Sequence, residues 1–273
     1  MLTQAEKGRA FAELHKRAGT FIIPNPWDVG SARLLTHLGF EALATSSAGY
    51  AFSIGKSDNA VGRDAMLTHA TAVAAATDLP VSIDLENGFG DAPESVADTI
   101  RRAAGTGAAG GSIEDATERS DDPIYERSLA VARIRAAAEA VRDLPFPFIL
   151  TARCENYLVG RPDLKDTIER LQMYQEAGAD VLYAPGLTTK EDIAAVVSSV
   201  DRPVNVLMGL KGVELSLADL SAIGVKRISV GSALARCALT ALLRGAREMK
   251  DNGTFRFADD AEPFRSINSL FIN

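Results

Sequence analysis

The chain alternates short apolar runs with longer alanine-rich segments in which apolar residues recur at helical spacing. Turn-forming residues precede the apolar runs, as at Asp78–Pro80 and Gly178–Asp180. Short runs of this kind are typical of buried strands, and the segments between them are typical of amphipathic helices. The predicted strands are Phe21–Ile23, Ala42–Ser46, Val81–Glu86, Gly110–Glu114, Phe148–Ala152, Val181–Ala184, Val204–Leu207 and Arg227–Val230.

Strands that alternate with helices predict a parallel sheet. Eight such units within 273 residues favour one (β/α)₈ TIM barrel, and no Pro/Gly/Ser-rich linker divides the chain. We therefore expect a single α/β domain over residues 1–273, with a helical extension from about residue 233. An open, doubly wound sheet is the alternative fold.

Charge and composition exclude several classes of function. The net charge of -7 opposes binding to nucleic acid, whose phosphates would repel an acidic surface. No run reaches the roughly 18 apolar residues of a membrane span, and the polar, helix-periodic start lacks an apolar leader. Cys154 and Cys237 are far apart and have no metal-ligand spacing. We expect a cytoplasmic protein whose partner is a small molecule.

Polar side chains stand at the ends of the predicted strands, where a barrel places its active site. They are Asn25, Trp27, Asp28, Ser46, Ser47, Asp84, Glu86, Glu114, Asp115, Arg153, Glu155 and, within its strand, Asn205. Asp84 and Glu86 are two residues apart, so on a strand they would share one face. Trp27 is interpreted equally well as a pocket wall or as packing under the first loop, and Asn205 as bonded to substrate or to a neighbouring barrel group.

A cluster of carboxylates needs a neutralising cation. Oxygen ligands without a nearby histidine favour Mg²⁺, with Mn²⁺ as the other choice. The alternative is that Asp84, Glu86 and Glu114 only form salt bridges with barrel arginines.

Four segments resemble the isocitrate lyase/phosphoenolpyruvate mutase superfamily. They are "TSSAGYA" at the second strand, "DLENGFGD" at the third, "GGSIEDA" at the fourth and "TARCENY" at the fifth. The resemblance implies a barrel whose last helix is exchanged between subunits, and hence a homo-oligomer, a dimer or a tetramer. It also implies Mg²⁺ bound together with a 2-oxo acid or its enolate.

The resemblance assigns roles to individual residues. Asp84 would be the main metal carboxylate, and Glu86 and Glu114 would hold metal-bound waters. Arg153 would face the substrate carboxylate or the enolate oxygen. Asp58 matches an acidic residue on the mobile loop of the family, so that Arg153, Glu114 and Asp58 form the expected catalytic set. The expected substrate-binding residues are Trp27, Ser46, Ser47, the amide of Ala48, Glu155 and Asn205.

The chain also departs from the family. Lyases that cleave isocitrate or methylisocitrate carry a Lys-Lys/Arg-Cys-Gly-His run after the fourth strand, where this chain has Ala116–Asp122 without cysteine or histidine. The Lys-Thr-Asn or Lys-Thr-Thr stretch of the phosphonate enzymes is missing too. We expect an Mg²⁺-dependent lyase acting on a C–C bond of a small 2-oxo or 2-hydroxy acid, by retro-aldol cleavage or decarboxylation. A P–C bond enzyme and a carboxylate-binding barrel with little turnover are the alternatives.

Overall fold

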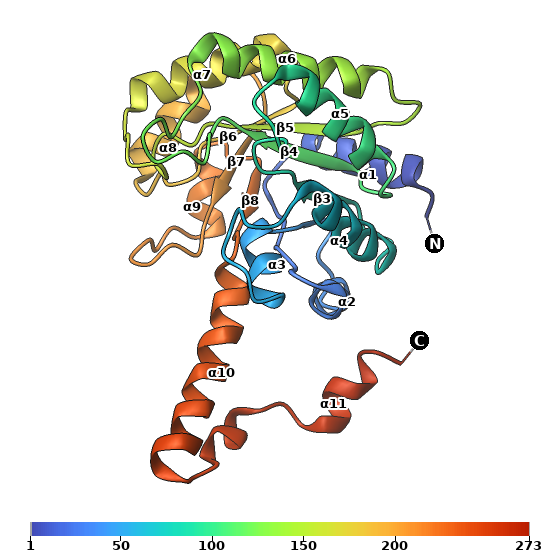
Figure 1. Ribbon diagram of the computed structural model, residues 1–273, viewed down its shortest axis with the longest axis vertical. Coiled ribbons are helices and arrows are strands. Elements are labelled where there is room, and N and C mark those ends of the chain that lie inside the picture. Colours follow the sequence, from blue (N-terminus) through green and yellow to red (C-terminus); the bar gives the residue numbers. More distant parts are fainter. Residues whose placement is uncertain (1, 273) are drawn as a thin grey trace.

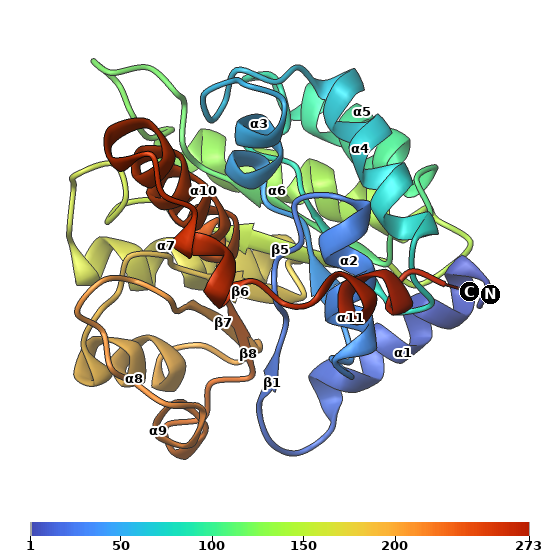
Figure 2. The same ribbon diagram turned by 90° about the horizontal axis from the view of Figure 1, so that it is seen from below.

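The computed structural model describes residues 2–272, and eight parallel strands in it curve into a barrel (Figures 1 and 2). The strands are β1 (Phe21–Ile22), β2 (Leu43–Ala44), β3 (Val81–Asp84), β4 (Gly110–Glu114), β5 (Ile149–Arg153), β6 (Val181–Tyr183), β7 (Val204–Leu207) and β8 (Arg227–Ser229). Their order is β1-β8-β7-β6-β5-β4-β3-β2. Because β8 pairs with β1 and every other pair is consecutive, the predicted barrel is confirmed and the open sheet is not the fold.

Two hydrogen bonds close the ring between β1 and β2. The amide of Ala44 donates to the carbonyl of Pro24 at 3.0 Å, and the side chain of Asn25 donates to the carbonyl of Thr45 at 3.0 Å. Asn25 also accepts from the amides of Val230 and Gly231, at 2.9 Å each. The polar residue predicted after the first strand therefore joins β1, β2 and β8 at the rim.

Helices surround the strands. They are α1 (Gln4–Lys16), α2 (Val29–His37), α3 (Ser47–Ser53), α4 (Arg63–Ala75), α5 (Pro93–Ala104), α6 (Arg127–Arg142), α7 (Leu164–Ala177), α8 (Lys190–Ser198), α9 (Leu217–Ala222), α10 (Ala233–Asn252), the 3₁₀ helix η1 (Arg256–Asp260) and α11 (Phe264–Ser269). Local sequence explains their starts: Thr3 and Glu6 form a capping box on α1, and Asp28 caps α2 through the amide of Ser31.

The apolar core lies between the strands and the helices, while the inside of the barrel is largely polar. Ile83 of β3 and Leu150 of β5 belong to a cluster with helical residues such as Ile100 and Ile134. The strand residues Ser82, Asp84, Ser112, Asn205 and Ser229 line an internal cavity instead. The two-residue alternation of the strands thus separates apolar packing from a hydrophilic interior.

Helix α1 closes the amino end of the barrel. Its residue Phe11 is fully buried in a cluster with Phe21, Ile149 and Val181, the first residues of β1, β5 and β6. The open end of the barrel is therefore the carboxyl end of the strands.

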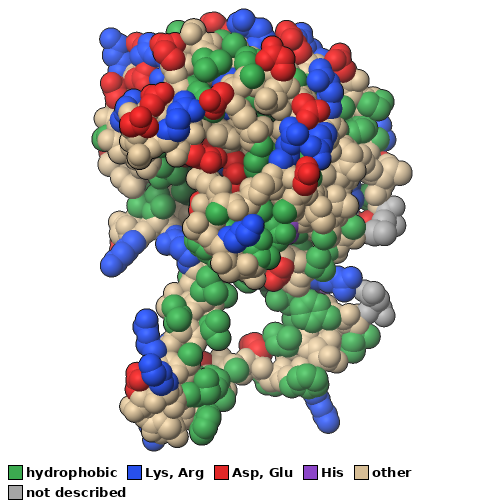
Figure 3. All heavy atoms as spheres, viewed as in Figure 1, with side chains coloured by type: hydrophobic (Ala, Val, Ile, Leu, Met, Phe, Trp, Pro, Cys, Tyr) green, Lys and Arg blue, Asp and Glu red, His purple; other side chains and the backbone are tan. Residues whose placement is uncertain are grey.

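The chain leaves the barrel at α10, which projects away from it and is followed by η1 and α11 (Figure 1). Only Ala235 and Gly245 of α10 are buried. Exposed apolar side chains run along the whole segment: Leu234, Leu239, Leu242, Leu243, Met249, Phe255, Phe257, Phe264 and Ile267. Figure 3 shows such side chains gathered on this arm, residues 233–272. In residues 2–272 no helix combines the length and apolar character needed to cross a membrane.

Candidate active site

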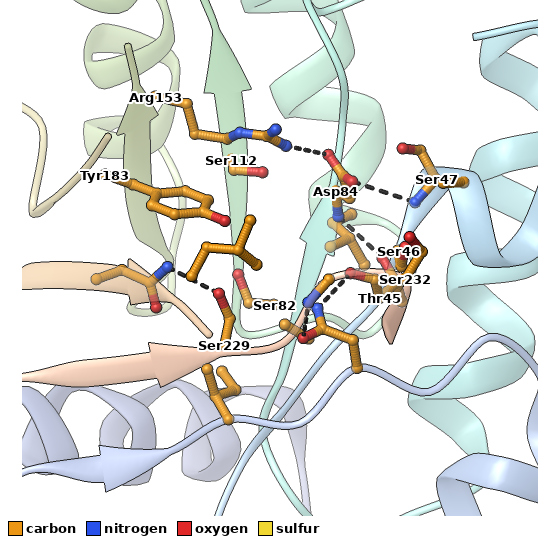
Figure 4. A pocket seen from close by; sticks show the side chains of 18 of the residues that line it. Thr45, Ser46, Ser47, Ser82, Asp84, Ser112, Arg153, Tyr183, Ser229 and Ser232 are labelled. Atoms are coloured by element: carbon orange, nitrogen blue, oxygen red, sulfur yellow. Dashed lines mark hydrogen bonds and ion pairs between the residues drawn. The ribbon is translucent and has the colours of Figure 1, made fainter. Parts of the chain in front are cut away.

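The carboxyl ends of the strands surround a cavity of about 180 Å³ (Figure 4). Of the residues expected at the site, those that line it are Ser46, Ser47, Ala48, Asp58, Asp84, Arg153 and Asn205. The remaining ones, Trp27, Glu86, Glu114 and Glu155, are not among its lining residues. The cavity lies at the end of the barrel where enzymes of this architecture carry their active sites.

Arg153, the last residue of β5, contacts three carboxylates. Its Nη1 lies 3.1 Å from Asp84 Oδ1 and 3.0 Å from Glu114 Oε2, and its Nε donates to Glu155 Oε1 at 2.9 Å. Burial by itself lowers the pKa of Arg153, but the attraction of Glu114, Glu155 and Asp84 outweighs it and raises that pKa. The guanidinium group is therefore charged and fixed in direction, with Tyr183 stacked 5.3 Å from it.

The cluster around Arg153 contains more acidic groups than one arginine can neutralise. Burial raises the pKa of Glu114 and of Glu155 even though Arg153 attracts their charged forms. Burial, followed by repulsion from Asp84, also raises the pKa of Asp58. Such a cluster is stabilised by an additional cation, since buried like charges repel each other strongly.

Asp84 is held in place by its neighbours on β2 and α3. Its amide donates to Thr45 Oγ1 at 2.9 Å, and its Oδ2 accepts from the amide of Ser47 at 3.1 Å. The hydroxyl of Ser47 donates to Asp58 Oδ1 at 3.1 Å. Ser46 is the N-cap of α3, because its hydroxyl accepts from the amide of Gly49. The second-strand motif therefore positions both acids of the cavity.

Glu86 does not share a strand face with Asp84, contrary to the alternation argument. Strand β3 ends at Asp84, and Glu86 adopts a left-handed backbone conformation with φ of 50°. It borders a neighbouring hollow together with Asn59, Asn87 and Glu118. The turn that follows Asp84 replaces the pleat, so a spacing of two no longer means the same face.

The environment of Glu86 nevertheless fits a metal ion nearby. Its side chain is 3% exposed, its Oε1 has no hydrogen-bond partner, and its amide donates to Asp84 Oδ1 at 3.3 Å. Burial, with repulsion from Asp84, Glu118 and Asp58, raises the pKa of Glu86 to about 8. Asp84 and Glu114 each form a salt bridge with Arg153, but Glu86 has no ion pair within residues 2–272.

Across residues 2–272, no group of three His, Cys, Asp or Glu side chains is arranged to hold a metal directly. Mg²⁺ commonly keeps several waters and binds only one or two protein carboxylates. Asp84, Glu86 and Glu114 are oxygen donors of the kind that such an ion prefers.

A second row of polar groups supports β5 and its loop. The side chain of Asp115 accepts from the amide of Glu155 at 2.8 Å, from the hydroxyl of Tyr174 at 2.5 Å and from Arg170 at 3.3 Å. Asp115 was predicted only as a strand-end residue. Two of its partners, Arg170 and Tyr174, lie on α7, 55 and 59 residues away, and Glu155 is 40 residues away, so no local pattern could have identified this supporting role.

The sequence left two interpretations open for Trp27 and two for Asn205, and the structure gives the position of each side chain. Trp27 is half-buried outside the cavity lining, with its Cβ against Gly49 of α3. Asn205 both lines the cavity and bonds to barrel neighbours, donating to Ser229 Oγ at 2.9 Å and accepting from Arg227 Nε at 2.8 Å.

Several cavity residues were not predicted. Ser82, Ser112, Tyr183, Arg227 and Ser229 all line the cavity. Figure 4 shows that Ser112 lies close to Arg153, and that Ser229 lies near Tyr183. The available signal was the occurrence of polar residues at alternate positions of otherwise apolar strands.

The chain matches the sequence model of the phosphoenolpyruvate phosphomutase family over residues 11–250. It is 30% identical over 205 residues to 2-methylisocitrate lyase from Escherichia coli K12, covering 72% of this chain and 68% of that enzyme.

Solved structures of other proteins are similar to this one over nearly the whole chain. A protein from Burkholderia cenocepacia J2315, assigned only provisionally as a lyase or mutase, is 64% identical with a TM-score of 0.97, covering 99% of this chain and 97% of that one. Oxaloacetate acetylhydrolase, solved with its product oxalate, is 26% identical with a TM-score of 0.85, covering 98% of this chain and 93% of that one.

Proposed function

Because the chain belongs to the phosphoenolpyruvate mutase/isocitrate lyase superfamily, we propose that it is an Mg²⁺-dependent lyase. Its substrate would be a small 2-oxo or 2-hydroxy carboxylic acid, and its reaction the cleavage of a C–C bond through a pyruvate-like enolate. The observation that carries this proposal is the contact of Arg153 with Asp84 and Glu114 at the edge of an acid-rich cavity.

The metal-binding residues would be Asp84 directly and Glu86 and Glu114 through water. When bound, Mg²⁺ would neutralise the carboxylate cluster and stabilise negative charge on the oxygen of the substrate. The unpaired Oε1 of Glu86 and the excess of acids around Arg153 support this assignment.

Arg153 would stabilise the charge that develops as the bond breaks. A guanidinium group offers two parallel donors to a carboxylate or enolate, and its three acidic partners fix its direction before substrate arrives. Ser47 and the amide of Ala48 border the same cavity and would bind the substrate carboxylate at the start of α3. Asp58 would close over the bound substrate.

The proton that the enolate takes up needs a donor other than cysteine. Glu118, Asp121 and Asp122, the acids of the loop after β4, are all exposed, but of the three only Glu118 borders the same hollow as Glu86. Burial, together with repulsion from Asp58, raises the pKa of Glu118, which favours its protonated form. Glu118 is therefore the acid of this loop best suited to donate a proton.

The second candidate function is cleavage or formation of a P–C bond. The matching family model, described as phosphoenolpyruvate phosphomutase, favours it. The missing Lys-Thr-Asn or Lys-Thr-Thr stretch opposes it, because the loop here reads Ala116–Asp122.

The test is a panel of substrates assayed with and without Mg²⁺: oxaloacetate, 2-alkylmalates, isocitrate, methylisocitrate and phosphonopyruvate. We expect Mg²⁺-dependent turnover of a C–C substrate and no turnover of phosphonopyruvate. Isocitrate and methylisocitrate should turn over slowly, since an optimised general acid typically contributes about 10²–10⁴-fold. Turnover of phosphonopyruvate alone would favour the second candidate. Binding without turnover of any compound would favour a carboxylate-binding barrel.

We further propose that the molecule is a homo-oligomer whose arm, residues 233–272, packs against another subunit. The many exposed apolar side chains of the arm support this, because isolated proteins seldom expose so large an apolar surface. Exchange of an identical segment between subunits would bury it by symmetric contacts.

A further inference from the structure

Arg227 is a buried cation without an acidic partner. It is the first residue of β8 and is 4% exposed. Its Nε donates to Asn205 Oδ1 at 2.8 Å and its Nη2 donates to Thr151 Oγ1 at 3.0 Å. Within residues 2–272, no carboxylate oxygen lies within 4.0 Å of its nitrogens. All its direct partners are neutral groups or a histidine.

The histidine beside Arg227 does not compensate its charge. Nε2 of His15, on α1, lies 3.5 Å from Arg227 Nη1. Burial, followed by repulsion from Arg227, lowers the pKa of His15 to about 3, so the ring is neutral at neutral pH. Burial lowers the pKa of Arg227 itself to about 10, which leaves the guanidinium charged.

The other arginines inside the molecule have either acidic partners or several backbone carbonyls around them. Arg153 contacts three carboxylates, and Arg170 contacts Asp115 and Asp166. Arg133 donates to the carbonyls of three residues in the loop after β3 and lies over the ring of Tyr125. Arg227 differs from Arg133 and Arg170 in a further respect, because it borders the cavity.

The cavity therefore has two cationic ends. At the mouth stands Arg153, already surrounded by acids; deeper, beside the end of the barrel that α1 closes, stands Arg227. The wall between them carries the hydroxyl groups of Ser82, Ser112 and Ser229 (Figure 4). Three of the five N–H groups of Arg227 face the partners named above, so two have no partner within residues 2–272.

We propose that Arg227 forms a second anion subsite inside the barrel, which binds an anionic oxygen group at the far end of the substrate. This inference rests on the proposed function and deepens it, because it makes the substrate a dianion. One carboxylate would lie near Arg153 and Asp84, and the second acidic group would lie near Arg227. An anion bound there would remove the free-energy cost of the uncompensated buried charge. The subsite would also discriminate against substrates that lack a second acidic group.

The experiment compares matched pairs of unreactive ligands by calorimetry in the presence of Mg²⁺. The dicarboxylates malonate, succinate and glutarate are each compared with the monocarboxylate of equal carbon number. We expect at least one dicarboxylate to bind the wild-type protein ten-fold or more tightly than its monocarboxylate. In Arg227→Met, this ratio should fall to about two-fold or less, while the monocarboxylate affinity stays the same.

Lys7→Met is the matched control. Lys7 is another buried cation, 5% exposed, but it donates to the carbonyls of Ala74 and Thr77 away from the cavity. Lys7→Met should keep the dicarboxylate preference. If the loss of a buried cation acted only by weakening the packing of the protein, Lys7→Met and Arg227→Met would both lose this preference. 3-Phosphonopropionate is compared with succinate in the same way, and the tighter of the two identifies the group as phosphonate or carboxylate.

Two results would overturn the subsite. One is equal affinity of the wild-type protein for every matched pair, which does not depend on whether Arg227→Met folds. The other is an unchanged dicarboxylate preference in Arg227→Met. Failure of the proposed function would look different, because ligand binding would then be independent of Mg²⁺ whatever the number of carboxylates.

Discussion

At the scale of single residues, the site depends on how acids are distributed around Arg153. The same side chain contacts Asp84, Glu114 and Glu155, so it organises the cluster while facing the cavity. The proposed role of Arg153 in catalysis and its observed role in structure can be separated by a substitution that keeps the charge and changes the geometry.

Arg153→Lys should lower kcat by roughly 10²–10³-fold, because a point ammonium group cannot reproduce a two-pronged donor. The thermal stability should change much less, since a lysine can still neutralise part of the acidic cluster. Steady-state kinetics and a melting curve on the same preparation check this. Near-normal turnover in the variant would mean that Arg153 is only structural.

His15 provides a prediction about stability and pH. Its pKa is lowered to about 3 in the folded protein, mainly by burial, from an ordinary value of 6.5. The stabilising contribution of the neutral ring is therefore complete above pH 6.5 and is lost as the pH falls toward 3. Between pH 7 and pH 5 the wild-type protein should lose about 2 kcal/mol more than His15→Leu. Denaturant unfolding at both pH values measures the difference, and equal losses in the two proteins would contradict the assignment.

Individual residues also mark the limit of sequence reasoning. Asp84, Arg153 and Asn205, which were selected as polar residues of the strand ends, line the cavity because parallel strands bring their carboxyl ends together. Glu86 was misplaced, since a left-handed residue just after β3 ends the alternation. Arg227 escaped notice because its importance lies in the absence of an acid, which only tertiary contacts reveal.

At the scale of elements, the predicted strands agree with the observed ones, usually to within two residues at either end. The strand ends were placed too late on β2 and β3, because Thr45 and Leu85 lie where the chain turns toward the site loops. The Ala116–Asp122 loop and the arm from Ala233 both lack the regular pattern of the barrel. Their positions in space therefore could not be predicted from periodicity.

At the scale of the whole molecule, the barrel predicted from the alternating pattern of strands and helices is confirmed, and so is the superfamily predicted from four short motifs. The motifs lie at or just after the ends of β2, β3, β4 and β5, and they supply Ser47, Asp84, Glu114 and Arg153, which form a chain of contacts in the structure. Because these four residues meet at the same end of the barrel, the four motifs together identify the superfamily more specifically than any one short motif does.

The arm leads to a prediction about assembly. Leu242 and Leu243 are 65% and 51% exposed, so the double substitution by glutamate should not disturb the barrel but should weaken subunit contacts. Light scattering coupled to gel filtration should show a dimer or larger oligomer for the wild-type protein and smaller species for the variant. Lys250→Glu, a charge change at an already polar position of α10, is the control and should assemble normally. A monomeric wild-type protein would contradict the proposal.

The most direct test of the central claim is calorimetry with Mg²⁺ and oxalate, an unreactive planar anion that resembles a pyruvate enolate. The wild-type protein should bind oxalate tightly only when Mg²⁺ is present. Asp84→Ala should lose this Mg²⁺-dependent binding while keeping a normal circular dichroism spectrum, because Asp84 lies at the edge of the cavity rather than in the apolar core. Oxalate binding that is the same with and without Mg²⁺, or unchanged Mg²⁺-dependent binding in Asp84→Ala, would contradict the account.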